Sequence, residues 1–595
     1  MRRGEEKMES DLNITALSHG ELVTFVYRLR QQLEEHDQEI ARLKQQLSEE
    51  HVATVNRDRR VSVQFDIGAA VGATKGFDIE QLAEPVFDFI DDQETRIDSV
   101  WWDWCEGNEA VWSSRLLPIM DHPPFKEWAA RGIDPVRIIL DETKRRGLEA
   151  FFAYRINGGD HDTGEVSRIP MKDAHPDWLI HPPWPLNGYW NFAIQGVRDY
   201  KLSILREVAE DYDFDGIEID FSRACPVLPV GRQWESREAL TDFMRSVRSM
   251  LLEVEEKRGQ PFLLAARVPE TLEGCHFDGM DVETWARERL VDIFVLGERS
   301  FDVDIPAFRR ITSGTDIKLY PTIDDHHSSD GYRHPPIEVF RGVLANWWSQ
   351  GADGVQTFNW HYARPETQDR LGLGRWIPEM PDRFGPNSKP GPAWATQRQV
   401  YRELVSPQAI EQKDKTFVVQ RRGGGYAPSF VPLPEDWSTP RRSYHNTNML
   451  APLPASLRND GKADTMLTVA VADDVATDAD AIDQVTIHLL ISDPAAEHLP
   501  DGDRLDLATI ATMAHPDNHL DTIPAAKGIE DQIELRLNNL LLDRPIADQG
   551  WLVFKAQPGQ FAVGNNLIGL RVSSRPPDAQ GEISVEKLEV HVTYR

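Results

Sequence analysis

Carboxylates are concentrated in one short stretch of the chain, 211-DYDFDGIEIDFSRACP-226. Glu218 and Asp220 are two residues apart in an apolar, β-branched frame, so in a strand their side chains lie on the same face. Burying two carboxylates is costly unless they are ion-paired or hydrogen-bonded. One interpretation is therefore an internal ion pair with Arg155 or Arg267. The other is acid chemistry, because hydrolysis of a sugar linkage needs one carboxylate as nucleophile or base and one carboxylic acid as proton donor.

The elements around this stretch alternate between short apolar strands and helices. Helical segments such as 134 to 147, 197 to 212 and 234 to 259 separate runs rich in β-branched and aromatic residues. Over residues 58 to 408 this alternation predicts an α/β fold, a (β/α)8 TIM barrel, closed by a helix at 394 to 404. A doubly wound sheet is the alternative, but no GxGxxG or P-loop motif follows any strand. The predicted strands are 61–67, 97–103, 149–155, 216–221, 262–268, 291–296, 317–323 and 353–360.

Polar and aromatic residues gather at the carboxyl ends of these strands. In a barrel of this kind those ends open onto the βα loops, so reactive groups converge there on one mouth. Glu218 lies deeper in its strand than Asp220, and we expect it to tune its neighbour. The catalytic candidates are Asp220, Glu298, Asp324 and Glu218, and the substrate-binding candidates are Asp66, Trp102, Asp103, Arg155, Asn157, Arg223, Arg267, Asp325, His326, Asn359, Trp360 and His361.

Arginine and tryptophan are frequent around the same strand ends. The arginines either neutralise and orient the acids or bind an anionic group such as a uronate or a sulfate, for which the planar guanidinium is well suited. The flat indole rings offer stacking surfaces for sugars, although some of them must belong to the core. The arginines are Arg155, Arg223, Arg267 and Arg299, and the tryptophans are Trp101, Trp102, Trp104, Trp184, Trp190 and Trp360.

Acids and histidines alternate in the predicted loop 324-DDHHSSDGYRH-334. Such a run could be read as a metal site, because zinc takes fixed histidine ligands and hard cations take oxygen ligands. A contiguous loop more often makes hydrogen bonds to substrate, so we expect neither a metal nor another cofactor. Asp324, the first acid after its strand, is then a second candidate for the proton donor.

Two runs, 175-HPDWLIH-181 and 190-WNFAIQGVRDYKLSILREVAEDYDFDGIEIDFSR-223, resemble bacterial glycosyl hydrolase-like barrels. Members of that family show an "HPEW" loop, an "LNPGNPEVR" helix start and a "DGIHLDYVRYP" fourth strand. In the similar alpha-galactosidase and alpha-glucosidase barrels, an Asp at the end of strand four is the nucleophile and an acid near strand six donates the proton. The resemblance therefore implies Asp220 as nucleophile and Glu298 as proton donor.

The chain departs from another carbohydrate-active pattern at Ser222. Chitinase-like barrels carry "DGIDIDWE", and the last Glu of that motif is their catalytic acid. The aligned residue here is Ser222, which cannot donate a proton in that way, so a chitinase-type mechanism is disfavoured. The proton donor is therefore expected at the end of strand six or strand seven.

The two ends of the chain predict different architectures. After Ser18, apolar residues recur at alternating spacings of four and three up to Leu47, with His36 as a polar exception. Within residues 1 to 50 this heptad pattern favours an oligomerising coiled coil over a single helix packed on its own domain. Residues 411 to 595 alternate like half-buried strands and predict an all-β sandwich, either a sugar-binding module or a brace for the barrel.

The composition of the chain limits the kinds of molecule that it is expected to bind. A formal net charge of −32 and a pI near 5.0 argue against nucleic acid and against an anionic membrane surface. Three cysteines without CxxC spacing, no apolar leader and no long apolar run fit a cytoplasmic protein. We therefore expect a homo-oligomeric glycoside hydrolase acting on an oligo- or polysaccharide, neutral or anionic. A catalytically inactive carbohydrate-binding or scaffold protein is the alternative.

Overall fold

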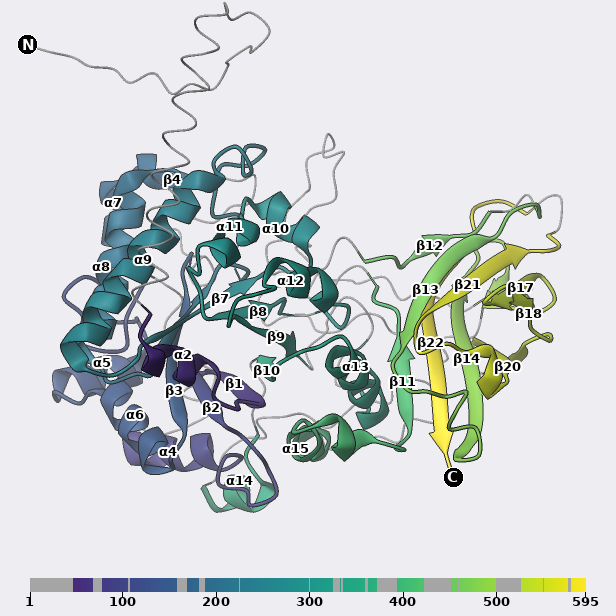
Figure 1. Ribbon diagram of the computed structural model, residues 1–595, viewed down its shortest axis with the longest axis horizontal. Helices are drawn as coiled ribbons and strands as arrows, with labels where there is room; N and C mark the ends of the chain where they lie inside the picture. The colour runs from purple at the N-terminus through teal and green to yellow at the C-terminus, as the bar shows by residue number, and fades with distance from the viewer. Residues whose placement is uncertain are drawn as a thin grey trace, which may run out of the picture.

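Eight parallel strands form a closed barrel in the computed structural model (Figure 1). The strands follow one another round the ring in chain order, and β1 pairs with β10 to close it. The predicted (β/α)8 fold is thereby confirmed, together with all eight predicted strands. The structure describes residues 47–67, 78–104, 108–157, 169–180, 188–223, 225–298, 300–324, 332, 335–358, 362–371, 393–421, 451–458, 461–498, 526–548, 550–575 and 579–595.

The barrel strands are short and separated by helices on the outside. Strand β6 begins at Gly216, where a side chain would clash with the ring of Phe151 on the neighbouring strand β3. The strands are β1 (Val61–Asp66), β2 (Ser99–Asp103), β3 (Glu149–Arg155), β6 (Gly216–Asp220), β7 (Leu263–Val268), β8 (Ile293–Leu296), β9 (Lys318–Ile323) and β10 (Val355–Phe358). A small hairpin of β4 (Leu179–Ile180) and β5 (Tyr189–Trp190) lies between β3 and β6.

Helices begin and end at residues that satisfy their free backbone groups. The Asp134 side chain accepts a hydrogen bond from the backbone N–H of Arg137 at the start of α6, and α9 ends at Gly259 with a φ of 67°. No helix among the described residues is long and apolar enough to cross a membrane. The helices of this part are α4 (Ile79–Phe87), α5 (Pro123–Ala130), α6 (Pro135–Arg145), α7 (Pro170–Ala174), α8 (Gln195–Asp211), α9 (Arg237–Arg258), α10 (Leu272–Asp278), α11 (Val282–Arg287), α12 (Ile305–Ile311), α13 (Ile337–Ser349), α14 (Pro365–Leu371) and α15 (Ala393–Glu403).

The barrel interior is divided into an apolar layer and a charged layer. At the amino-terminal ends of the strands, Trp101 and Phe151 stack with ring centroids 4.3 Å apart, and Leu263, Ile293 and Tyr320 pack in the same buried cluster. This layer closes the bottom of the barrel. The inward positions nearer the carboxyl ends are charged, and they form the candidate site described below.

Antiparallel sheets follow the barrel, as the alternating sequence pattern predicted (Figure 1). In β13 the side chains of Leu467, Val469 and Val471 are buried while their neighbours are more exposed, and the two larger sheets share one buried apolar core. One sheet runs β11-β22-β14-β20-β19 with β12 beside β22, and the other runs β13-β21-β17-β18. Their bounds are β11 (Lys415–Val418), β12 (Ala455–Ser456), β13 (Thr465–Val471), β14 (Ile482–Ser492), β17 (Ile533–Leu537), β18 (Leu540–Leu541), β19 (Ile546–Asp548), β20 (Trp551–Ala556), β21 (Gly564–Val572) and β22 (Ser584–Tyr594).

Helix α13 joins the barrel to these sheets. It lies beside β11 in Figure 1, and a side chain at Gly342 would clash with the backbone carbonyl oxygen of Thr416. The Asn346 side chain donates a hydrogen bond of 3.0 Å to the carbonyl oxygen of Ala470 in β13. Close backbone approach and a half-buried hydrogen bond therefore hold the sheets against the barrel.

A short helix, α2 (Glu49–Val55), packs under the amino-terminal end of the barrel. Ser48 is extended and its hydroxyl accepts a hydrogen bond from the backbone N–H of His51, so α2 begins there as a separate helix. Residues 49 and 50, predicted to end the N-terminal helix, thus belong to α2. The predicted coiled coil itself falls almost entirely within residues 1 to 46, outside the described residues.

Candidate active site

Glu218 and Asp220 project into the barrel from β6, and Arg267 from the adjacent β7 contacts both. The guanidinium Nη2 of Arg267 lies 2.8 Å from Glu218 Oε1, and its Nε lies 3.3 Å from Asp220 Oδ2. All three side chains are buried. The internal ion pair, one of the two interpretations of these acids, is therefore present, and it is formed with Arg267. Arg267 also donates to the carbonyl oxygen of Gly297, to Thr322 Oγ1 and to Gln356 Oε1.

Asp220 is further held by the turn that follows its strand. Its Oδ1 accepts hydrogen bonds from the backbone N–H groups of Ser222 and Arg223, at 2.9 and 2.8 Å. The guanidinium Nε of Arg223 in turn lies 3.5 Å from Glu298 Oε1, just beyond β8. Arg223 thus touches Asp220 through its backbone and Glu298 through its side chain. Asp220 and Glu298, two of the catalytic candidates, are thus both in contact with Arg223.

Burial perturbs both acids of β6. It raises the pKa of Glu218 to about 7, although the charge of Arg267 acts in the opposite direction. Burial also raises the pKa of Asp220 to about 6, again against Arg267, and the negative charge of Glu298 adds to the rise. The two carboxyls lie close enough to titrate as a pair, and both hold a proton more readily than an exposed acid does.

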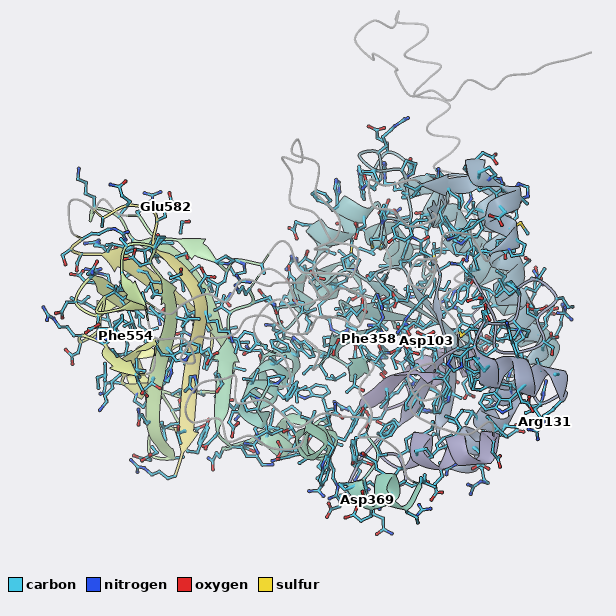
Figure 2. The ribbon with its side chains drawn as sticks, turned by 180° about the vertical axis from the view of Figure 1, so that it is seen from behind. Asp103, Arg131, Phe358, Asp369, Phe554 and Glu582 are labelled. Atoms are coloured by element: carbon cyan, nitrogen blue, oxygen red, sulfur yellow. The ribbon has the colours of Figure 1, made fainter. Side chains whose placement is uncertain are left out.

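A second cluster of charges lies on β1, β2 and β3. Arg155 Nε is 2.6 Å from Asp103 Oδ2, and Arg155 Nη1 is 3.1 Å from Asp66 Oδ2. The ring of Phe358, labelled with Asp103 in Figure 2, lies beneath both guanidinium groups, 5.6 Å from that of Arg155 and 4.8 Å from that of Arg267. The face of one aromatic ring therefore makes cation–π contacts with both guanidinium groups.

Trp102 does not join this mouth, and its predicted substrate role is corrected. Its indole Nε1 donates to Thr143 Oγ1 of α6, and its ring packs 5.1 Å from that of Phe65 between strand and helix. Adjacent strand residues face opposite sides, so Asp103 and Trp102 cannot both face the interior. The other described tryptophans proposed as sugar platforms, Trp101, Trp104 and Trp190, are also buried in the core.

Asn157 supports the loops around the mouth. Its Oδ1 accepts a hydrogen bond from the backbone N–H of Trp190, and its Nδ2 donates to the carbonyl oxygen of Pro226. These contacts join β5 to the loop that follows Asp220. Asn157 therefore helps to shape the wall beside the acids.

The remaining predicted residues divide into one described acid and several outside the described part. Asp324 directly follows β9 and is buried. Within the described ranges no group of three or more His, Cys, Asp or Glu side chains could hold a metal ion. Outside the described residues lie Asp325, His326, Asn359, Trp360, His361, Arg299 and Trp184.

Sequence reasoning missed three inward residues that contact the charged layer. Gln64 donates a hydrogen bond of 3.1 Å to Asp103, Gln356 accepts from Arg267, and Phe358 lies under two arginines. The signal was present, because strict alternation in β1 and β10 places Gln64, Gln356 and Phe358 on the inward face. Polar residues at inward strand positions should therefore be included with the acids among the candidate site residues.

Residues 71–232 match the profile of a family described as Glycosyl hydrolase-like 10. The matched segment includes β2, β3 and β6, and so carries Asp103, Arg155, Glu218 and Asp220 of the site. This match confirms the resemblance that the sequence of residues 175 to 223 indicated. The protein is thus a (β/α)8 barrel followed by antiparallel sheets, and its residues 71–232 are similar to glycosyl hydrolase-like proteins.

Two curated relatives are named as glycosyl hydrolases. Over 112 residues the chain is 30% identical to Glycosyl hydrolase YngK of Bacillus subtilis (strain 168), which covers 18% of this chain and 20% of YngK. Over 137 residues it is 27% identical to Glycosyl hydrolase DigH of Escherichia coli (strain K12), which covers 22% of this chain and 31% of DigH. The chain thus aligns with less than a third of either relative. A solved alpha-amylase from Geobacillus thermoleovorans, complexed with acarbose, is 12% identical with a TM-score of 0.35 over 87% of this chain and 99% of that one.

Proposed function

We propose that the barrel is a glycoside hydrolase that cleaves a glycosidic bond of an oligo- or polysaccharide with two carboxylates. Asp220 attacks or stabilises the oxocarbenium-like centre, and Glu298 protonates the leaving oxygen. The observation that carries the proposal is the link through Arg223, which bonds Asp220 at 2.8 Å through its backbone and approaches Glu298 to 3.5 Å through its side chain. The similarity of residues 71–232 to glycosyl hydrolase-like proteins supports it.

Glu218 acts on Asp220 instead of on substrate in this proposal. It lies two residues deeper in β6, and its carboxylate bonds to Arg267 at 2.8 Å. Because Arg267 contacts both acids, a proton gained or lost by Glu218 changes the net charge around Asp220 and so its pKa. Asp324, at the end of β9, is the second candidate for the proton donor.

The pairing of charges among the described residues of the barrel mouth supports a neutral glycan as the substrate. Arg155, Arg223 and Arg267 each have carboxylate partners within 3.5 Å, so their charges are already matched inside the protein. An anionic sugar would have to compete with those carboxylates for each guanidinium. We therefore place neutral oligosaccharides before uronates and sulfated glycans as substrates.

Substitution of the two acids tests this assignment. Asp220→Asn is expected to lower kcat on the order of 10³-fold or more while substrate binding persists, because the attacking group is lost and the shape is kept. Glu298→Gln is expected to lose about 10² to 10⁴-fold on natural glycans and much less on nitrophenyl glycosides, whose leaving groups need no proton. Asp324→Asn is the matched control. If Asp324→Asn shows that leaving-group pattern and Glu298→Gln does not, the donor assignment is wrong.

The ion pairs also support a second candidate, a barrel that binds carbohydrate without cleaving it. Arg267 is matched to Glu218 and Asp220 as in a purely structural charge cluster. An inactive barrel would bind oligosaccharides in calorimetry, show no turnover, and keep its affinity in Asp220→Asn. Turnover that is abolished by Asp220→Asn excludes this candidate.

Assembly through the N-terminal segment is a separate proposal. We propose that the heptad positions from Leu22 to Leu47 associate between copies of the chain, with His36 helping to set the register. Removal of residues 1 to 46 is expected to reduce the number of chains in each sedimenting particle and to leave turnover unchanged. An unchanged number of chains would contradict the proposal.

A further inference from the structure

Two aromatic residues join the loops that carry the proton-donor candidates. Phe301 lies three residues beyond Glu298 in the loop after β8, and Tyr332 lies in the loop after β9, beyond Asp324. Their rings meet edge to face, with centroids 5.7 Å apart and an interplanar angle of 68°. Both are buried. The described contact between the two loops is therefore a packed pair of buried rings.

The C-terminal sheet contacts this aromatic pair directly. The Tyr332 hydroxyl donates a hydrogen bond of 2.9 Å to Glu589 Oε1 on β22, and the ammonium of Lys587 lies 3.7 Å from the centre of the Tyr332 ring. Glu589 Oε2 lies 2.8 Å from His591 Nε2. Burial alone would raise the pKa of Glu589, but His591 and Lys587 outweigh it and lower the pKa to about 2. Tyr332 therefore has a permanently charged acceptor on the sheet.

The same sheet region fixes the backbone of Phe301. The N–H of Phe301 donates a hydrogen bond of 2.9 Å to the side-chain Oε1 of Gln420, which follows β11 and is fully buried. The carbonyl oxygen of Phe301 accepts a hydrogen bond of 3.1 Å from Trp347 Nε1 on α13. Gln420 itself is oriented by its Nε2, which donates to the carbonyl oxygen of Arg421. Both backbone polar groups of Phe301 are thus held.

We infer that Gln420 and Glu589 are positioning residues for the proposed reaction, and that the C-terminal sheets complete the catalytic unit by holding Phe301 and Tyr332 in place. This inference rests on the proposed glycosidase function. The four residues, here called the loop clamp, hold Phe301, which lies three residues after Glu298, and Tyr332, which lies eight residues after Asp324. Displacement of a catalytic group by about 1 Å can cost about 10²-fold in rate. The sheets accordingly act as a brace, and their removal would disorganise the site without touching an acid.

Variants that remove one clamp bond each test the inference in the full chain. Tyr332→Phe removes only the hydroxyl that bonds Glu589, and Gln420→Met keeps the side-chain length but removes the acceptor for Phe301. Each is expected to lower kcat roughly tenfold with KM changed less than twofold. The matched control is Tyr594→Phe, which removes a tyrosine hydroxyl bonded at 2.5 Å to Asp473 in the same sheet region. A loss in the control equal to that in Tyr332→Phe would overturn the inference.

Hydrogen–deuterium exchange separates failure of the clamp from failure of the proposed function. The amide of Phe301 is expected to exchange at least tenfold faster in Gln420→Met than in the wild type, and unchanged in Tyr594→Phe. Unchanged exchange at Phe301 would overturn the clamp, whatever the activity. Faster exchange without any turnover in the wild-type protein would instead contradict the proposed glycosidase, and with it the positioning role. Faster exchange with unaltered kcat would show that the clamp does not position the acids.

Discussion

His51 is expected to make the docking of α2 dependent on pH. The ring is completely buried, with Nδ1 2.7 Å from Glu255 Oε2 and Nε2 3.0 Å from Asp292 Oδ1. Two carboxylate partners require a proton on each ring nitrogen, so the docked imidazole is charged. Burial alone would lower the pKa of His51, but the charge of Asp292 and the hydrogen bonds to both acids raise it to about 9.

The size of the effect follows from this pKa. A rise from the ordinary 6.5 to about 9 corresponds to about 3 kcal/mol of docking free energy. Because the pKa is raised in the docked state, the contribution is complete below about pH 6.5 and is lost as the pH rises through 9. Asp292 keeps Arg248 as a partner at 2.8 Å when α2 leaves, so its own charge persists. About 3 kcal/mol amounts to roughly a hundredfold change in the opening equilibrium.

Hydrogen–deuterium exchange of residues 49–55, corrected for the intrinsic dependence on pH, measures this opening. Protection of α2 is expected to fall roughly a hundredfold between pH 6 and pH 9.5 in the wild type. In His51→Gln the protection is expected to be low at pH 6 and nearly constant over the same range. His276→Gln, which changes an exposed histidine on α10, is the matched control and should follow the wild type.

The reasoning is refuted if protection of α2 changes by less than about threefold over this range. It is equally refuted if His51→Gln retains the wild-type dependence on pH, because the titrating group would then lie elsewhere. A fall of protection on acidification instead of on alkalinisation would reverse the sign and would mean that the docked ring is neutral.

Other changes have outcomes that can be measured directly. If Asp220 must be ionised, the acid limb of the kcat/KM profile, which reports the free protein, should have its midpoint near pH 6, where burial places the pKa of that carboxyl. Arg267→Met is expected to move this limb to higher pH, because the charge of Arg267 lowers the pKa of Asp220, and an unmoved limb would reject Asp220 as the titrating group. Gly342→Ala is expected to destabilise the protein by about 1–3 kcal/mol, because the new methyl group meets the carbonyl of Thr416. Gly559→Ala, with nothing within 4 Å, should alter the midpoint of thermal unfolding far less, and equal shifts in the two variants would contradict the close packing.

The barrel could be predicted because its strands carry local signals. Each predicted strand is a short β-branched or aromatic run between helical segments, and each appears within a few residues of its expected place. The inward direction of Glu218 and Asp220 also followed from a period of two, and the structure places both inside. Successive side chains of any strand point to opposite faces, so locating a strand in the sequence also tells which of its residues share a face.

The identity of the contacting partners was not encoded in the same way. Arg155 and Arg267 were both possible partners for the acids of β6, and only the closed ring decided that Arg267 takes them while Arg155 turns to Asp103. The substrate role expected of Trp102 was wrong for a related reason. A Trp in a strand reads the same from the sequence whether it faces the mouth, the bottom layer or the helices.

By itself, the sequence determined the alternating elements, the position of the acids on one strand face and the similarity to glycosyl hydrolase-like proteins. The tertiary structure alone decided which charges meet, because ion pairs such as that of His51 with Asp292 join residues more than two hundred positions apart. It also decided that Gln420 and Glu589 reach the loops of the barrel mouth. Contacts of this kind depend on how whole domains pack, and no local pattern of residues specifies that packing.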